Sequence, residues 1–248
     1  MVKRDITSVY KQTILGPVWM IIQPIFTTAI YTFTFSSTAK MSTDNIPPVL
    51  FYLIGQVFWN YFSDSLNKTS NTFIANAGVF GKVYFPRLVM PISVIISNLV
   101  KLGIQLGLLL IIYLYYYFTT DSLHPNIYIL FVPIFIIFLG IFGLSLGVIF
   151  SSLTTKYRDF TFLLGFAVQL IMFASCVVFP LSMYSQKIQN LLAYNPIVTF
   201  MEAIRFSLTG NGSFNIVNIL ISQAIIILFL FFGIIMFSKT EKTFMDSV

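Results

Sequence analysis

The charged residues inside apolar runs are the ones that could carry chemistry in this chain. Lys101 lies in a long apolar run, and Glu202 and Arg205 stand three residues apart in another. On a helix that spacing allows a salt bridge, so we expect a structural pair, with a gate or a substrate contact as the alternative. For Lys101 two interpretations stay open: it lines a pathway for an anionic substrate, or it snorkels or pairs with a neighbouring helix.

Residues for catalysis and metal binding are scarce. The chain has one histidine, His124, and one cysteine, Cys176, which excludes a two-histidine site, an internal disulfide and a CxxC redox pair. Residues 78–82 resemble part of a phosphate-binding loop, but Val83 stands where such a loop needs Ser or Thr to hold magnesium. We therefore expect that the chain is not an enzyme and holds no metal and no cofactor.

Composition places these residues in a membrane protein. Of the 248 residues, 57% are hydrophobic and 9% are charged, whereas a soluble domain carries about 25% charged residues. So little charge cannot cover a soluble globule, and the high hydrophobicity excludes a disordered chain. The net charge of +6 is scattered between apolar runs, which is typical of topology signals rather than of a nucleic-acid-binding surface.

Six stretches are apolar enough to cross a membrane as helices, which takes about 20 residues. The sequence therefore predicts an all-α polytopic membrane protein in which residues 1–248 form a single transmembrane domain. With both termini in the cytoplasm, ten basic residues lie inside and three outside, as the positive-inside rule requires. The predicted spans are residues 18–37, 48–64, 88–118, 128–150, 162–181 and 216–237.

Three segments outside these spans have distinct patterns. Residues 1–16 carry an apolar helical face with basic residues largely off it, which indicates an amphipathic helix in the membrane interface, or else a basic orientation tag. Residues 80–87 indicate a short amphipathic piece at the cytoplasmic face. Residues 182–215 are too apolar for a solvated loop and are broken at Asn195 and Pro196, so we expect two short re-entrant helices in the outer leaflet.

Small and aromatic residues give weaker signals. The pairs Gly103/Gly107 and Gly143/Gly147 have GxxxG spacing, which allows close helix packing within the chain or, as the alternative, between two chains. Aromatic residues make up 17% of the chain, and they are expected in an interfacial belt or, alternatively, stacked on sugars.

The predicted spans contain almost no acidic residues. Ion-coupled transporters keep such residues near the midplane as relays. If the chain takes part in transport, we therefore expect the energy to come from a partner subunit.

Short motifs follow one another along the chain: Arg4-Asp5, residues 10–13, 15–17 with Trp19, 23–24, 81–87, 156–159, and 194–196 with Phe200, Glu202 and Arg205. With these motifs in this order on six spans, the chain resembles the membrane subunit of the type-2 ABC exporters that move O-antigen, capsule or teichoic-acid polysaccharides. The resemblance covers nearly the whole chain.

The resemblance implies a homodimer in the cytoplasmic membrane, joined to two separate ATPase subunits that hold the ATP and magnesium. It also implies a channel between the protomers for a lipid-linked polysaccharide, with a cytoplasmic coupling helix and an outer gate. By the same resemblance the ATPase contacts are Asn76, Phe80, Gly81, Lys82, Tyr84, Phe85, Pro86, Arg87, Lys156, Arg158 and Asp159. The residues that attract the lipid phosphate are Lys3, Arg4, Lys11 and Arg87, the gate residues are Tyr194, Asn195, Pro196, Phe200, Glu202 and Arg205, and Lys101 is a candidate for the channel lining.

Two rival functions remain. The first is a type-2 ABC exporter of a drug or a small lipid, although such exporters typically carry large outer domains or fused ATPases, which this chain lacks. The second, from another class, is a secondary transporter or channel that works without ATP. Copurification with an ATPase subunit separates the second rival from the ABC exporters.

Overall fold

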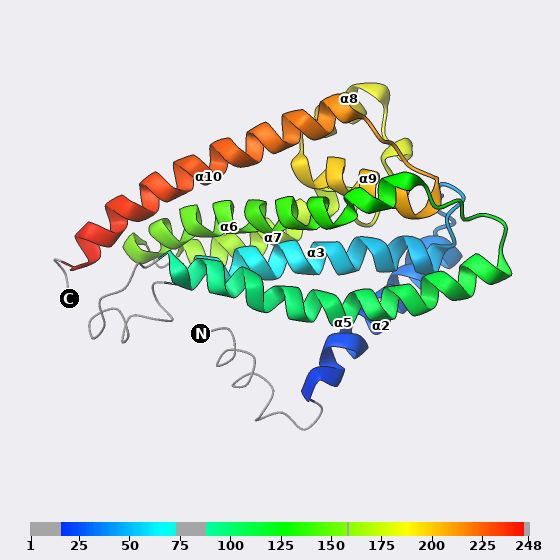
Figure 1. Cartoon of the computed structure of the whole chain (residues 1–248), viewed down its shortest axis with the longest axis horizontal. Coiled ribbons are helices and arrows are strands. Elements are labelled where there is room, and N and C mark those ends of the chain that lie inside the picture. Colours follow the sequence, from blue (N-terminus) through cyan, green and yellow to red (C-terminus); the bar gives the residue numbers. More distant parts are fainter. Residues whose placement is uncertain (1–15, 73–87, 158, 246–248) are drawn as a thin grey trace.

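The computed structural model describes residues 16–72, 88–157 and 159–245, and every regular element in these ranges is a helix (Figure 1). The all-α fold class is therefore confirmed for the described part of the chain. In chain order the elements are η1 (Gly16–Val18), α2 (Trp19–Tyr31), η2 (Thr32–Thr38), α3 (Pro48–Ser70), α5 (Val89–Thr119), η3 (Ile127–Phe131), α6 (Val132–Lys156), α7 (Phe160–Ala174), η4 (Leu181–Met183), α8 (Gln186–Leu192), α9 (Pro196–Thr209) and α10 (Ile216–Met245).

Helix α3 lies at the centre of the bundle (Figure 1, cyan). Of its 23 residues 16 are buried, and it packs most extensively against α6 and α5. α5 runs antiparallel to it, because Asp64 meets Lys101 while Lys68 meets Asn98. α2 packs against both α3 and α5, α10 packs along α6, and α9 contacts both α6 and α10.

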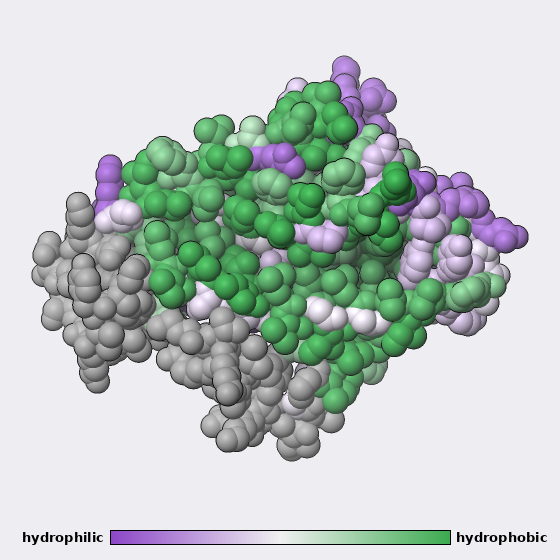
Figure 2. Space-filling view, in the orientation of Figure 1, coloured by the Kyte–Doolittle hydropathy of each residue, from purple (hydrophilic) through white to green (hydrophobic). Residues whose placement is uncertain are grey.

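Three helical stretches are long and apolar enough to cross a membrane: Val89–Thr119, Ile127–Lys156 and Ile216–Thr240. Apolar side chains cover the middle of the face in Figure 2, whereas hydrophilic residues gather mainly at the right-hand end and along the top edge. Such a surface is unfavourable in water but suits a bilayer. The chain is therefore a helical membrane protein with several membrane-crossing helices.

The helices follow the predicted spans, with differences at some ends. α3 continues past residue 64 to Ser70. α7 ends at Ala174, although a helix was predicted as far as residue 181. The chain bends there, with Cys176 at a φ of 53°. The backbone carbonyls of residues 176 and 177 accept hydrogen bonds from a side chain instead of continuing a helix.

Residues 182–215 contain two short helices, α8 and α9, as predicted, while their re-entrant place in the outer leaflet stays a prediction. Asn195 ends the connection between them, and its side chain accepts a hydrogen bond from the Ile197 amide at 3.0 Å, which is an N-cap. Pro196 takes the first helical position, where its missing N–H costs nothing. Gly210 ends α9 in the left-handed region at a φ of 78°. The expected interfacial helix (1–16) and coupling segment (80–87) lie almost wholly outside the described residues.

Candidate functional site: a polar face on α3 and a buried arginine

From residue 50 to its C-cap at Asn71, the accessible side of α3 carries only polar side chains. Between residues 50 and 72 all residues are buried except six, and these follow a spacing of three and four, so they share one side of the helix. Polar side chains in membrane helices face the bundle interior or a water-filled space rather than lipid. We call these six the α3 polar face: Asn60, Ser63, Asp64, Asn67, Lys68 and Asn71.

Hydrogen bonds link the α3 polar face to itself and to α5. The Gln56 amide donates to Asn60 Oδ1 at 2.8 Å, and the Asn67 amide donates to Ser63 Oγ at 3.2 Å. Lys68 Nζ donates a hydrogen bond to Asn98 Oδ1 on α5 at 2.7 Å. Among the described residues, Gln56 Oε1 and Asn60 Nδ2 are buried without a partner, so this face still has hydrogen-bonding capacity for water or a polar solute.

Lys101 borders the α3 polar face and is paired. Its Nζ lies 2.7 Å from Asp64 Oδ2, and the two side chains are 20% and 28% exposed. Of the two interpretations for Lys101, pairing with a neighbouring helix is therefore what the structure shows. Because both charges remain partly accessible, the pair is worth about 1 kcal/mol or less, and its side chains still meet the space beside α3.

The opposite side of α3 packs tightly on α6 through glycines. A Cβ on Gly143 would lie 2.8 Å from Ser65 Cβ, and one on Gly147 would lie 2.6 Å from Thr69 Cβ. The prediction of close packing within the chain is thus confirmed for this GxxxG pair. It is wrong for Gly103 and Gly107, because a Cβ on either would meet no described atom within 4 Å.

Arg205 joins α9, the first turns of α3 and the end of α7. Its side chain is 1% exposed. Nη1 donates to the Cys176 carbonyl at 2.7 Å and to Glu202 Oε1 at 3.1 Å, and Nη2 donates to the Val177 carbonyl at 3.0 Å. The guanidinium also lies 3.8 Å from the ring centroid of Phe51 on α3, a cation–π contact.

The salt bridge predicted between Glu202 and Arg205 is therefore confirmed, and its geometry is structural. The two carbonyls that Arg205 binds follow directly after α7 and are left without helical partners by the bend. Gly55 of α3 allows the approach, because a Cβ there would lie 2.7 Å from the Val177 carbonyl oxygen. The end of α7 is thus held between α3 and α9.

The other predicted gate residues lie on α9 or next to it. Phe200 is buried, and its ring lies 5.6 Å from Phe135 and 5.9 Å from Phe138 of α6. Tyr194, in contrast, is 60% exposed. Asn195 Nδ2 donates to Ser175 Oγ at 3.3 Å, a second link to the end of α7. The structure thus brings these residues together, with most of them packed inside.

The predicted ATPase and lipid-phosphate residues lie mostly outside the described residues. Lys156 ends α6, and its Nζ lies 5.1 Å above the Tyr157 ring, while Asp159 directly precedes α7. The predicted contact residues that lie outside the described part of the chain are Lys3, Arg4, Lys11, Asn76, Phe80, Gly81, Lys82, Tyr84, Phe85, Pro86, Arg87 and Arg158.

Residues 143–147 read Gly-Leu-Ser-Leu-Gly, the GxSxG spacing of a hydrolase nucleophile. That motif works on a sharp turn between a strand and a helix. Here Ser145 lies inside α6, is fully buried, and donates its hydroxyl hydrogen to the Ile141 carbonyl. The geometry gives this serine no role as a nucleophile.

The α3 polar face was not predicted from the sequence. The sequence does contain the pattern of such a face, because polar residues recur there with helical spacing. One row is Asn60, Asp64 and Lys68, and the adjacent row is Ser63, Asn67 and Asn71. A search for the helical period of polar residues, rather than for mean hydropathy, would have found it.

A polytopic helical bundle with a polar face inside it is consistent with transport, and comparison with known families identifies the kind of transporter. The sequence profile of the ABC-2 type transporter family matches residues 1–209. The chain belongs to this family.

Three relatives share most of their length with this chain. Two are O-antigen export system permease proteins RfbA from Klebsiella pneumoniae, 25% and 26% identical over 246 residues, which is 98% of this chain and 91% of each relative. The third, an O-antigen export system permease protein RfbA from Myxococcus xanthus, is 23% identical over 205 residues, which is 82% of this chain and 76% of the relative.

Proposed function

We propose that this chain is the membrane subunit of an ATP-driven exporter that moves a lipid-linked polysaccharide, most specifically an O-antigen, across the cytoplasmic membrane. The observation that carries the proposal is the α3 polar face. It offers amide, hydroxyl and charged groups to a hydrophilic solute along about 16 Å of helix, from Asn60 to Asn71 at 1.5 Å per residue. The names of the relatives supply the substrate class.

The proposed topology has six spans with both termini in the cytoplasm. Six helical segments would cross the membrane: α2 with η2, α3, α5, α6 with η3, α7 and α10. The short helices α8 and α9 would enter from the outer side and return to it. The alternating directions of α3 and α5 fit this order. The segments before α2, between α3 and α5, and between α6 and α7 would then all meet the cytoplasm.

One chain supplies only one wall of a conduit, because the α3 polar face is open on one side. A second copy opposite would close it, so the proposal includes a homodimer. ATP binding and hydrolysis take place in two separate subunits of the complex. These would contact residues 76–87 and 156–159, while the basic residues of the N-terminal and coupling segments attract the phosphate of the lipid carrier.

α9 is proposed as the outer gate. Arg205 ties it to the end of α7 and to α3, so a displacement of α7 would be passed to α9 through the bonds to the carbonyls of residues 176 and 177. A rigid-body shift of the protomers, driven by the ATPase subunits, would then open and close the conduit.

Deletion of the gene, followed by blotting for surface polysaccharide and for lipid-linked glycan inside the cell, tests the function. Loss at the surface with accumulation inside supports the proposal. Normal amounts of both would point to an exporter of a drug or a small lipid. Purification without any ATPase subunit would point to a secondary transporter or channel.

A further inference from the structure

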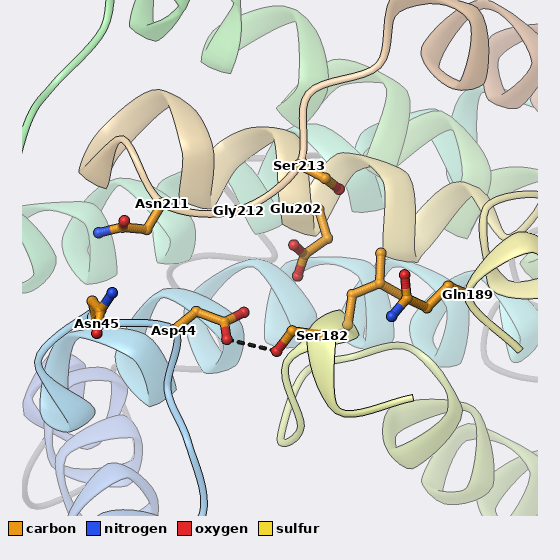
Figure 3. A pocket seen from close by; sticks show the side chains of 9 residues that line it. Asp44, Asn45, Ser182, Gln189, Glu202, Asn211, Gly212 and Ser213 are labelled. Carbon is orange, nitrogen blue, oxygen red and sulfur yellow. Dashed lines mark hydrogen bonds between the residues drawn. The ribbon is translucent and has the colours of Figure 1, made fainter. Parts of the chain in front are cut away.

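A polar cavity lies at the end of the bundle where α3 begins (Figure 3). It has a volume of about 360 Å³, and its walls come from the loop before α3, from η4, α8 and α9, and from the loop that follows α9. Under the proposed topology this is the outer end, beside the proposed gate.

The walls combine acceptors with donors. Asp44 and Glu202 supply carboxylates that point toward the same space, while Asn45, Gln189 and Asn211 supply amides (Figure 3). Most of these groups already have one partner in the protein. Ser182 Oγ donates to Asp44 Oδ1 at 2.6 Å, and Glu202 accepts from Arg205 at 3.1 Å and from the Ser213 backbone. The Gln189 and Asn211 amides donate to the carbonyls of Tyr184 and Ser122, and each has a second N–H to offer a ligand.

Glu202 is held in place as well as aimed at the cavity. Its side chain is 5% exposed and its partner Arg205 is 1% exposed, so neither can swing away without breaking buried bonds. Asp44 is fixed from the other side by Ser182. These bonds orient both carboxylates before any ligand arrives, which reduces the entropy lost on binding.

The chemistry of the walls selects the ligand class. An anion would be repelled, because two carboxylates line the cavity and no lining residue is a lysine or arginine. An apolar ligand would leave the polar groups unpaired, since Leu181 is the one large apolar side chain in the lining. A bare metal ion is far smaller than the cavity, and no group of three His, Cys, Asp or Glu with metal-binding geometry occurs among the described residues.

A neutral sugar ring fits what remains. Each sugar hydroxyl is both a donor and an acceptor, so adjacent hydroxyls pair with a carboxylate oxygen and an amide N–H together. The cavity volume is at the small end of the range for organic ligands, which suits one or two rings and not a whole polymer.

We propose that this cavity is a sugar-binding subsite that holds a terminal or passing ring of the exported glycan beside the gate. The choice of a sugar and the place of the cavity beside the gate rest on the proposed function, whereas the polarity of its walls does not.

Saturation-transfer NMR tests the subsite on the complex purified with its ATPase subunits. The probes are the methyl glycosides of glucose, galactose and mannose. We expect saturation transfer to at least one of them. Binding should weaken roughly five- to tenfold in Asp44→Asn, because a charge-assisted hydrogen bond becomes a neutral one. Asparagine tolerates the left-handed backbone of residue 44, whose φ is 53°, so this variant should fold.

Asn211→Ala, which removes an amide from the opposite wall, is the second variant and should also weaken binding. Asp121→Asn is the matched control, since Asp121 is an exposed carboxylate outside the cavity lining. No transfer to any glycoside, or equal binding by wild type and both cavity variants, would overturn the subsite. So would calcium binding that Asp44→Asn abolishes in the absence of glycoside binding.

The result is separable from the test of the proposed function. Loss of surface polysaccharide on gene deletion, together with no glycoside binding, removes the subsite alone. Glycoside binding that depends on Asp44, together with normal surface polysaccharide in the deletion strain, keeps the subsite and removes polysaccharide export.

Discussion

At the scale of single residues, Arg205 is a buried charge that ties three elements together. It brings a fully buried charge against one carboxylate, two backbone carbonyls and an aromatic ring. Replacing one partner of a buried ion pair leaves the other charge buried and unpaired. The free energy lost in this way exceeds the net stabilisation that the intact pair provides.

We expect Arg205→Met to destabilise the protein by about 3–5 kcal/mol, because Glu202 would lose its partner. Unfolding in detergent, followed by tryptophan fluorescence, measures this. Glu202→Gln combined with Arg205→Met should cost less than the sum of the single changes, since the two residues interact directly. Additive effects would show that the pair does not act as a unit.

Gly55 offers a second test at this scale. We expect Gly55→Val to lower the melting temperature and reduce export, because a side chain at residue 55 would press on the Val177 carbonyl and push the end of α7 away. Gly103→Val is the matched control, since residue 103 has open space beside it. Equal melting temperatures for the two variants would contradict the close packing of α3 on the α7 end.

At the scale of elements, α3 has a packed side and an accessible polar side, the α3 polar face, which we expect to be hydrated. Cysteine labelling distinguishes a hydrated face from one that contacts lipid. We expect Ser63→Cys and Asn67→Cys to react with a membrane-impermeant, water-soluble thiol reagent. Gly103→Cys and Leu110→Cys on α5 should not react, because their surroundings are apolar.

The native Cys176 provides an internal control for this labelling, since it is buried and should stay unmodified in the wild-type chain. Equal reactivity at residues 63 and 110 would mean that the α3 polar face does not border water.

Local patterns made some elements predictable from the sequence. The break at Asn195 and Pro196 follows from capping chemistry within four residues, and the Glu202–Arg205 pair follows from helical spacing. The carbonyls that bind Arg205 lie 28 and 29 residues away, at a bend that no local pattern marks. The two GxxxG pairs look alike in sequence, yet within the described residues Gly143 and Gly147 pack against another helix whereas Gly103 and Gly107 do not. Tertiary packing decides which side of a helix is covered.

At the scale of the whole molecule, the polar face lacks an opposite wall in one chain. We expect the purified complex to contain two copies of this chain and two ATPase subunits, which mass photometry in detergent would show directly. A complex with one copy of this chain would rule out a shared conduit.

The length of α7 has a consequence for the bilayer itself. A helix of 15 residues is about 22 Å long, whereas the hydrocarbon core of a bilayer is about 30 Å thick. If α7 crosses as proposed, we expect the bilayer beside it to thin toward its apolar length. The barrier that a charged lipid headgroup meets next to this helix would then be lower than elsewhere in the membrane.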